Sequence, residues 1–430
     1  MRRQLELSDR LAVLTAMAVD DHEGVPGHRA SRVGLPPPRL RHTGDVGALR
    51  PFNLRPIRMP GGGRTTLLRV LMTNACTFNC HYCPMRRDRD MPRTLIKPEE
   101  LVRVFLAARQ RDWCEGLFIT TGIAGRPMTV MDELITVLEL LRLKHRFAGY
   151  VHVKMVPGGD AAQIDRLTQL ASRVSINLEA PCGTTLQQIA PEKSLETTLV
   201  SLGRARDQVV EAWTDAAGGR PRDALRPRGA AGMTMQFVVG ATPDADRTII
   251  GRVSELYGAG GVHHAHFSAF RPIRDTPMES VQATPALREH RLYQADYLLR
   301  SYGFAVNELV YEADGNLPLG RDPKVAWALA HPEQFPVEVQ NATRETLLRV
   351  PGIGPASARR LVAARHATAI RDLADLRRLG VVTARAAGFL SLRGRRLRDA
   401  QWAEQLGFWR AEDEVGAPHV IYDVSPGTFR

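Results

Sequence analysis

The chain has 430 residues, of which 44% are hydrophobic and 24% charged, and its formal net charge at pH 7 is +12. This length predicts two or three domains with enough chain to bury a sizeable core. The chain holds no apolar run of the ~18 residues that a membrane span requires, and it begins without the apolar core of a secretion signal. Its five cysteines are typical of a reducing compartment, so we expect a cytoplasmic protein with no membrane partner.

Residues 1–62 predict an irregular leader rich in proline, glycine and arginine. One short helix is expected near Leu5–Val19. After it, a Gly-Leu-Pro-Pro-Pro run at 34–38 and three glycines at 61–63 interrupt any regular pattern.

From Leu67 to Tyr302, strand and helix patterns alternate. Strand candidates lie at Leu67–Thr73, Gly116–Thr121, Tyr150–Val156, Arg173–Glu179, Met233–Val239 and His263–Phe270. Helical patterns lie at Lys97–Arg111, Thr129–Arg146, Asp160–Ala171, Leu195–Ala212, Pro243–Tyr257 and Pro285–Tyr302. Alternating βα units of this length predict a parallel sheet with helices outside. We therefore expect an α/β domain over residues 63–305, built as a partial, TIM-like (β/α)6 barrel. A basic insertion at 216–232 precedes the fifth strand.

Three cysteines, Cys76, Cys80 and Cys83, fall within eight positions directly after the first predicted strand. At the spacing C-x3-C-x2-C, three thiolates hold three irons of a 4Fe–4S cluster and leave the fourth iron open to a ligand. The alternative is a structural zinc site, which requires a fourth Cys or His. His81 lies between ligand positions and is poorly placed for that role, and the remaining two cysteines are remote singles. The spacing therefore favours a cluster.

This run, with the aromatic Tyr82 directly before its last cysteine, resembles the signature of the radical S-adenosylmethionine (SAM) superfamily. The resemblance implies a radical SAM barrel that binds a 4Fe–4S cluster through the three cysteines and chelates SAM on the open iron. One electron from the cluster would cleave SAM to a 5′-deoxyadenosyl radical, which abstracts hydrogen from the substrate. It also implies an electron donor such as a flavodoxin or a ferredoxin.

The second predicted strand ends in Thr120, Thr121 and Gly122, where the superfamily often has a turn that contacts the amino group of SAM. The resemblance makes these three residues, together with Tyr82, candidates for SAM binding. A helix N-cap role for one of the threonines is the alternative.

Lys154 and Glu179 lie near the ends of the third and fourth strands. They are candidate contacts of SAM or substrate, or they pair with each other across neighbouring strands. Asn177 shares the face of Glu179 because side chains alternate along a strand, and it is a candidate for binding the ribose or methionine part of SAM. No residue is assigned a catalytic role.

Two further groups of polar residues, four arginines and two histidines, lie near the predicted cluster loop and on the sixth strand. Arginines 86, 87, 89 and 93 follow the cysteines and face either a phosphate backbone or water, with water favoured. His264 and His266 share one face of the sixth strand and are expected to form a hydrogen-bonded wall. No second metal is assigned to them.

Residues 306–336 predict a connector, and Leu347–Leu361 after it resembles a helix–hairpin–helix motif. In its turn, Gly352 and Gly354 permit a tight bend and a close approach to a ligand. We expect the amides of this turn, including Ile353, and of the next helix to receive a phosphate. Arg359 and Arg360 follow one turn later, placed for neighbouring phosphates.

A degenerate second copy at Leu373–Val382 lacks the second glycine of the turn and is expected to pack against the first. Residues 337–392 thus predict a small all-α, tandem helix–hairpin–helix domain that binds DNA. A basic segment and C-terminal tail, 393–430, follow it.

The C-terminal region carries most of the positive charge. Between Asn341 and Ala400 there are thirteen arginines, no lysine and four acidic residues, a local excess of nine positive charges. Such an excess is typical of a polyanion-binding module. Hairpin contacts reach the phosphate backbone and not the bases, so sequence-nonspecific DNA binding is expected. A module for protein contacts is the alternative.

The order of these parts resembles a family of radical SAM proteins assigned to DNA modification or repair. Matching runs are Gly116–Gly122, Ala190–Ser194, Val239–Pro243, Arg291–Phe304 and Asp322–Leu329. The resemblance implies a radical enzyme acting on DNA, with a uracil-DNA-glycosylase-like protein partner. Two alternatives stay open: a radical SAM enzyme that modifies RNA, and a DNA-binding adaptor whose cluster is structural or redox-sensing.

Overall fold

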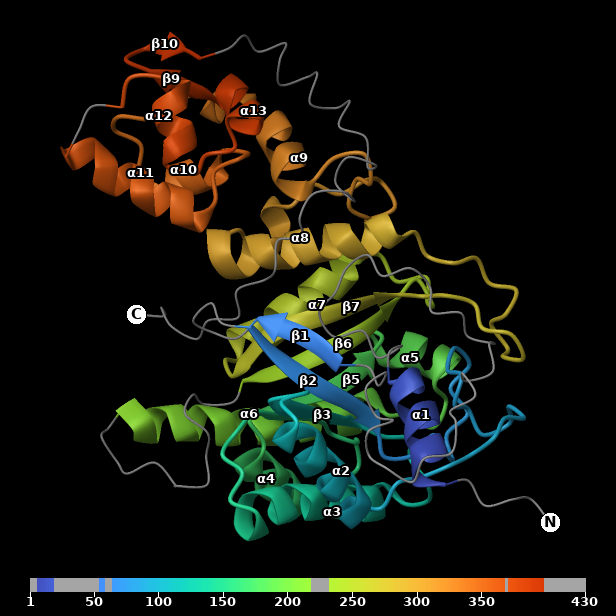
Figure 1. The fold of residues 1–430 in the computed structure, drawn as a ribbon. Helices are drawn as coiled ribbons and strands as arrows, with labels where there is room; N and C mark the ends of the chain where they lie inside the picture. The colour runs from blue at the N-terminus through green and yellow to red at the C-terminus, as the bar shows by residue number, and fades with distance from the viewer. Residues whose placement is uncertain (1–5, 19–53, 59–63, 218–231, 368–369, 398–430) are drawn as a thin grey trace. The chain divides into compact units, whose positions relative to one another are not determined.

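The computed structural model describes residues 6–18, 54–58, 64–217, 232–367 and 370–397 (Figure 1). These residues form two compact units. The first holds those up to 243 together with 256–284, and the second holds 244–255 and 285–397. Most of the predicted leader, most of the insertion at 216–232 and the tail after 397 lie outside the described residues.

A seven-stranded sheet forms the body of the first unit. Its strands lie side by side in chain order: β1 (Leu54–Arg58), β2 (Arg64–Leu71), β3 (Gly116–Thr120), β4 (Val151–Lys154), β5 (Arg173–Glu179), β6 (Met233–Val239) and β7 (Val262–Ala269). Strands β2 to β7 are parallel and correspond to the six expected strands. The predicted α/β class and partial (β/α)6 barrel are confirmed. Strand β1, which pairs antiparallel with β2, was not expected in the leader.

Six expected helices are present. They are α2 (Pro98–Gln110), α3 (Pro127–Glu139), α4 (Ala161–Leu170), α6 (Leu195–Ala217), α7 (Asp246–Gly258) and α8 (Ala286–Tyr302). A π-helical turn, Leu140–Lys144, extends α3, and an unexpected short helix, α5 (Gly183–Ile189), follows β5. None of the helices in the described ranges is both long and apolar enough to cross a membrane.

The two faces of the parallel sheet differ in polarity. On β4 and β5, apolar residues such as Val153 and Ile176 alternate with polar residues such as Lys154 and Ser175, and all four are buried. Parallel strands that are buried on both faces usually read as continuous apolar runs. Here one face is apolar and the opposite face is polar although it is buried. We call the second face the inner polar face.

The leader helix α1 (Leu7–Met17) confirms the helix expected there and packs against β2. Leu11 and Leu14 are fully buried. On the same helix, the Arg10 guanidinium makes a two-pronged ion pair with Glu100 of α2, at 2.8 and 3.0 Å. Asn74, two residues before Cys76, lies 3.4 Å from the Met17 sulfur. The helix therefore supports the segment that carries the cysteines.

The second unit contains the helix–hairpin–helix elements α10 (Arg344–Arg349), α11 (Pro355–Ala367), α12 (Leu373–Arg378) and α13 (Thr383–Ala386). The predicted connector contains a helix of its own, α9 (Pro323–Ala330), whose N-cap Asp322 accepts hydrogen bonds from the amides of Lys324 and Val325. Short 3-10 turns lie at Val306–Glu308, Pro332–Gln334 and Ala387–Phe389. A small sheet of β8 (Val337–Glu338), β9 (Leu390–Leu392) and β10 (Arg395–Arg396) accompanies the helices.

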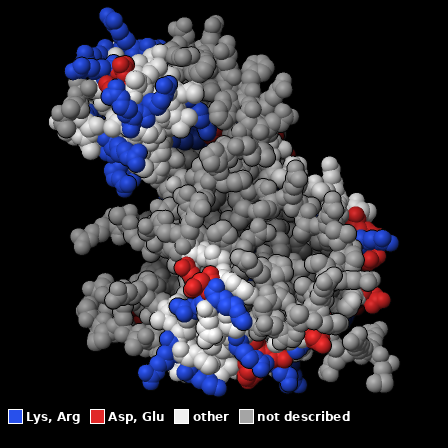
Figure 2. Space-filling model, in the orientation of Figure 1, with Lys and Arg blue, Asp and Glu red and all other residues white. Residues whose placement is uncertain are grey.

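Arginines dominate the exposed surface of the helix–hairpin–helix domain. Figure 2 shows Lys and Arg atoms gathered over the upper part of the view, with few Asp or Glu atoms among them. The exposed members are Arg344, Arg359, Arg360, Arg371, Arg377, Arg378, Arg393, Arg395 and Arg396. The charge excess counted from the sequence is therefore a property of the folded surface.

The Arg10–Glu100 pair makes the anchoring of α1 depend on pH. The hydrogen bond from Arg10 lowers the pKa of Glu100 below its ordinary value of 4.5 against the opposing effect of partial burial, and the Lys97 amide and then the charges of Arg10 and Arg103 add to the shift. The pair therefore stabilises the fold above that pH and loses its effect as the pH falls through the lowered pKa. We expect Arg10→Met to reduce the free energy of unfolding by about 1 kcal/mol at pH 7 and by much less at pH 3.

Urea unfolding of the variant and the parent at both pH values measures this difference. The exposed Arg103→Met is the matched control, because Arg103 contributes only its charge. An equal loss at both pH values would show that the ion pair with Glu100 contributes nothing, and that Arg10 acts only through packing and its hydrogen bond to the Leu95 carbonyl.

Candidate active site

The three cysteines lie in the loop between β2 and α2, and all are free thiols. Cys80 is buried, and Cys76 and Cys83 are partly buried. A turn closes from the Cys83 amide to the Cys80 carbonyl at 3.2 Å, and the Met85 amide donates to the Cys83 sulfur at 3.4 Å. Amide donors to sulfur are among the contacts by which proteins tune iron–sulfur clusters.

The end of β3 holds the first half of this cysteine loop. The Gly122 amide donates to the Thr73 carbonyl at 2.8 Å, and the Thr77 amide donates to the Ile123 carbonyl at 2.7 Å. A Cβ at Gly122 would lie 2.3 Å from the Ala75 carbonyl oxygen, which is closer than atoms can approach. Gly122 is therefore required where the two loops meet, directly beside Cys76.

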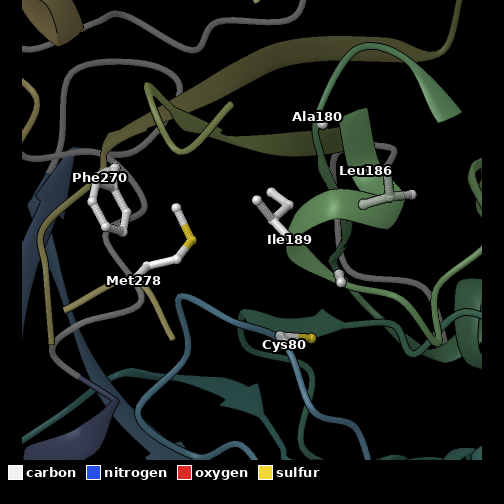
Figure 3. Packing of buried hydrophobic residues seen from close by; sticks show 7 residues of the cluster. Cys80, Ala180, Leu186, Ile189, Phe270 and Met278 are labelled. Atoms are coloured by element: carbon white, nitrogen blue, oxygen red, sulfur yellow. The ribbon is translucent and has the colours of Figure 1, made fainter. Parts of the chain in front are cut away.

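The segment after β5 holds the second half of the loop. The His81 amide donates to the Ile189 carbonyl of α5 at 2.7 Å, and the Asn79 amide donates to the Glu192 carboxylate at 3.1 Å. Around Cys80 these elements form an apolar cluster (Figure 3), whose other buried members are Ala180, Leu186, Ile189, Ala190, Phe270 and Met278. This wall keeps water away from the thiol and strengthens the electrostatic interactions beside it.

Arg93 closes the cysteine loop from inside. Its guanidinium donates to four backbone carbonyls, those of Asn74, Met85, Arg86 and Arg89, at 2.6–2.9 Å. The expectation that the arginines after the cysteines face water is wrong for Arg93, because loop carbonyls engage its guanidinium. It holds for Arg87, which is exposed beside Asp88.

Glu179 stands at the end of β5 in an unusual backbone conformation. The register of β5 against β6 shifts between Asn177 and Glu179, and Glu179 has φ +64°. Such left-handed, non-glycine residues at bulges redirect side chains and cluster at functional sites. The Glu179 side chain is 1% exposed, and its Oε1 accepts from Lys193 Nζ at 2.5 Å and from Asn177 Nδ2 at 3.1 Å.

The charges of this pair reach the cysteine loop. Burial opposes the charge on Lys193, but the neighbouring Glu179 carboxylate raises the Lys193 pKa above its ordinary value. The Glu179 pKa is lowered: its burial would raise it, and Lys193 overcomes that effect. Burial, followed by the nearby Glu179 charge, raises the pKa of Tyr82 well above its ordinary value. Tyr82, Asn177 and Glu179, three predicted SAM contacts, are thus gathered in one place.

The thiols fit a group that binds thiolates. Burial raises the pKa of Cys80 to about 11 and that of Cys83 to about 12. Cys76 and Cys80 add to the shift at Cys83, and Lys193 opposes both shifts. Deprotonation therefore needs a compensating positive charge, which iron supplies on binding. Within the described ranges no three His, Cys, Asp or Glu side chains gather closely enough for a single metal ion. Three features suit the cysteines to an iron–sulfur cluster: they share one loop, their thiols interact electrostatically, and the Met85 amide donates to the Cys83 sulfur.

The other predicted SAM contacts lie on neighbouring strands. The Thr120 carbonyl accepts from the Met72 amide at 2.9 Å, and the Thr121 hydroxyl donates to the Gly122 carbonyl at 2.8 Å. Lys154, which is 7% exposed, donates to Gln236 of β6 at 2.9 Å. The Glu179 carboxylate pairs with Lys193 at 2.5 Å, and the charge of Lys154 also helps to lower the Glu179 pKa. The pairing of Lys154 with Glu179 remains a prediction. The SAM-binding roles of these residues remain predictions.

The helix–hairpin–helix residues occupy a paired hairpin. Gly352 has φ +82°, and a Cβ on it would lie 2.5 Å from the Val382 carbonyl oxygen. The Val382 amide donates to the Gly352 carbonyl at 2.9 Å, so the two hairpins join through their backbones. Ile353 is 1% exposed, and its carbonyl accepts from the buried Lys324 ammonium at 2.6 Å.

Several residues of this module face outward. Arg359 and Arg360 are exposed on α11, and Gly354 is partly buried just before that helix. The Ile353 side chain is buried, so its predicted part in binding DNA can only come through the backbone. These binding roles, too, remain predictions.

The parallel half-barrel has its three cysteines in the first βα loop, as the resemblance to radical SAM domains predicts. The model of the radical SAM superfamily matches residues 70–220. A second model, described as a SAM-like helix-hairpin-helix tandem, matches residues 323–367 and 344–386. The chain therefore contains a radical SAM superfamily domain and a helix–hairpin–helix domain. The cofactors of the superfamily are a 4Fe–4S cluster and SAM.

Several solved structures match this chain at low identity. The hydrogenase maturase HydG matches at 14% identity and a TM-score of 0.42, covering 54% of this chain and 49% of HydG. Methylornithine synthase (PylB) matches at 10% identity and a TM-score of 0.42, covering 53% and 60%. A radical SAM methyltransferase from Sphaerobacter thermophilus matches at 16% identity and 0.38, covering 56% and 73%. This chain thus spans about half the length of HydG. No curated protein matches the chain in sequence.

Three site residues were not assigned from the sequence: Lys193, Gln236 and Arg93. Lys193 lies in the run Ala190–Ser194, which belongs to the family resemblance. Its ion pair with Glu179 could not be predicted, because it depends on helix α5, which brings Lys193 back to the end of β5. Gln236 is one of the alternating polar residues of β6, a pattern that could have identified it.

The bonding of Arg93 predicts its contribution to cluster assembly. Arg93→Met removes the donors to four carbonyls of the cysteine loop, at about 1 kcal/mol for each hydrogen bond. We expect the iron and sulfide bound per chain after anaerobic reconstitution to fall by at least about half. Arg87→Met removes a charge from the same loop without these bonds, and it should bind as much iron as the parent. Equal iron in both variants would contradict the role of Arg93.

Proposed function

We propose that this protein is a SAM-dependent radical enzyme that modifies or repairs DNA. The observation that carries the proposal is the presence, in one chain, of a radical SAM domain and a paired helix–hairpin–helix with an arginine-rich surface. The first supplies the chemistry, and the second is suited to holding a phosphate backbone.

The residues of the first unit divide the work of cofactor binding. Cys76, Cys80 and Cys83 would hold the cluster, and Tyr82, Asn177 and Glu179 would contact SAM. When bound, the cluster and SAM supply one-electron cleavage of a sulfonium and the hydrogen abstraction that follows. The chain itself orders the loop through Arg93, excludes water with the apolar cluster around Cys80, and places opposite charges at Lys193 and Glu179.

The second unit supports binding to nucleic acid. The helix α11 begins directly after the hairpin, and the amides of a helix's first turn have no partners within the helix, so they attract phosphate. Lys324 holds the Ile353 carbonyl and Val382 holds the Gly352 carbonyl, so the hairpin is fixed before a ligand arrives. Arg359 and Arg360 are exposed one turn further on. A uracil-DNA-glycosylase-like partner, an electron donor and a cytoplasmic location complete the proposal.

The radical activity is tested with anaerobically reconstituted protein, dithionite and SAM. We expect 5′-deoxyadenosine to form in the parent and to be absent from Cys83→Ser, which lacks one cluster ligand. Chromatography of the nucleoside products measures it. A parent that has an intact cluster but forms no 5′-deoxyadenosine would point to the DNA-binding adaptor instead.

DNA binding is tested with arginine variants of α11. We expect Arg359→Ala and Arg360→Ala each to raise the Kd for duplex DNA about 3- to 10-fold and to lower the salt dependence of log Kd by about one phosphate contact. Arg274→Ala, which removes an exposed arginine from the first unit, is the charge-matched control and should leave the Kd unchanged. Tighter binding of transfer RNA than of duplex DNA would favour the RNA-modifying alternative.

A further inference from the structure

The inner polar face continues from the cysteine loop into the barrel. Asn177 of β5 is in register with Gln236 of β6, and Gln236 is in register with His266 of β7. Two residues earlier, Thr234 of β6 is in register with Ser175 and with His264. Side chains in register on parallel strands point to the same side, and so do residues two apart on one strand. These residues therefore form one continuous surface.

This surface is buried although it is polar. Thr234 is 0% exposed, Gln236 5%, and His264 and His266 4% and 6%. A buried hydroxyl or amide that makes no hydrogen bond costs about 1–3 kcal/mol. Within the part of the chain that the structure describes, Thr234 Oγ1 and Asn177 Oδ1 are buried and make no hydrogen bond. In the free protein these two oxygen atoms are therefore left without a donor, although the amide nitrogen of Asn177 bonds to Glu179.

The chemistry of the atoms restricts what they could bind. Asn177 Nδ2 already donates a hydrogen bond to Glu179. Gln236 Oε1 already accepts one from Lys154. Asn177 therefore offers its oxygen as an acceptor, Gln236 its amide nitrogen as a donor, and Thr234 a hydroxyl that does both. A phosphate or a carboxylate carries acceptors alone and would face the Asn177 oxygen without a donor. A planar heterocycle with donors and acceptors along one edge matches the set.

The spacing of these side chains and the nearby histidine rings also suit a planar heterocycle. Residues two apart on a strand are separated by roughly 6.5 Å, which is about the width of a nucleobase edge. The rings of His264 and His266 lie beside these atoms on β7, 4.5 Å apart between centroids and nearly perpendicular at 81°. Proteins that take a base out of the stack bind it by edge hydrogen bonds and by contact with flat side chains.

We propose that the surface formed by Thr234, Gln236, Asn177, His264 and His266, here the base-reading face, binds a nucleobase of the substrate. The inference rests on the proposed function, because it names the part of the nucleic acid that enters the barrel. Asn177 joins this face to the candidate SAM site through its 3.1 Å hydrogen bond to Glu179. A base held there lies next to the residues where SAM would contact the protein.

Thr234→Val gives the sharpest test because valine has the same shape as threonine and lacks the hydroxyl. The hydroxyl makes no hydrogen bond in the free protein, so its removal should leave the Tm unchanged or raise it. The same change should weaken base binding. A purely structural threonine would show the opposite pattern, a lower Tm and unchanged binding. Thr197→Val, on the exposed surface of α6, is the matched control.

The probes are the free nucleosides deoxyuridine, thymidine, deoxycytidine, deoxyadenosine and deoxyguanosine. Each is titrated calorimetrically into the anaerobically reconstituted full chain with SAM. We expect at least one to bind, with its Kd raised about 5- to 20-fold in Thr234→Val and in Gln236→Leu and unchanged in Thr197→Val. These probes lack phosphate, so the result does not depend on the helix–hairpin–helix domain.

The outcomes separate the two proposals. Duplex DNA that binds through Arg359, together with no binding of any nucleoside, overturns the base-reading face and leaves the proposed function standing. Nucleoside binding that Thr234→Val does not change also overturns it. Nucleoside binding that Thr234→Val weakens supports the face, even if duplex DNA fails to bind and the proposed DNA substrate is lost.

Discussion

The buried ion pair between Glu179 and Lys193 is the constraint on which the candidate active site depends. Removing one partner of such a pair leaves an uncompensated buried charge, at a cost of about 3–5 kcal/mol. The pair joins the bulge at the end of β5 to the segment after α5, 14 residues further on, and through Tyr82 it reaches the cysteine loop, which is distant in sequence. The left-handed backbone at Glu179 is unfavourable by itself. It persists because Lys193 and Asn177, both partly buried, hold the side chain in that direction.

A loop that must carry a cofactor cannot rely on regular secondary structure for its rigidity. Here the rigidity comes from backbone bonds to Gly122 and Ile123 after β3 and to Ile189 at the end of α5, and from the Arg93 guanidinium within the loop. Gly122 and Ile123 lie just after β3, and α5 with Ile189 follows β5 along the chain. The (β/α)6 order brings the carboxyl ends of these strands to one edge, so the topology gathers the supports without further contacts.

Much of this arrangement follows from local patterns. The period of two in β5 and the clear helix signals around it identify the strands, and the cysteine spacing identifies the loop. Helix α5 was not predicted, because its seven residues are too few for a helical period to be recognised. Because α5 was not predicted, nothing in the sequence indicated that Lys193 lies next to Glu179. The role of Arg93 also could not be read locally, because an arginine that binds carbonyls and one that faces water look alike in sequence.

The two units use the same physical device for different purposes. At Gly122 and at Gly352, a missing side chain lets one backbone come within hydrogen-bonding distance of another. In the barrel this fixes the loop that carries thiols, and in the second unit it fixes a hairpin beside the start of α11. Both sites are therefore ordered by the protein before any ligand binds, so binding does not have to pay the entropy of ordering a loop. The inner polar face differs, because its Thr234 hydroxyl has no hydrogen-bond partner in the described structure. Such an atom costs stability in the free protein and is retained most readily where a ligand completes its hydrogen bonds.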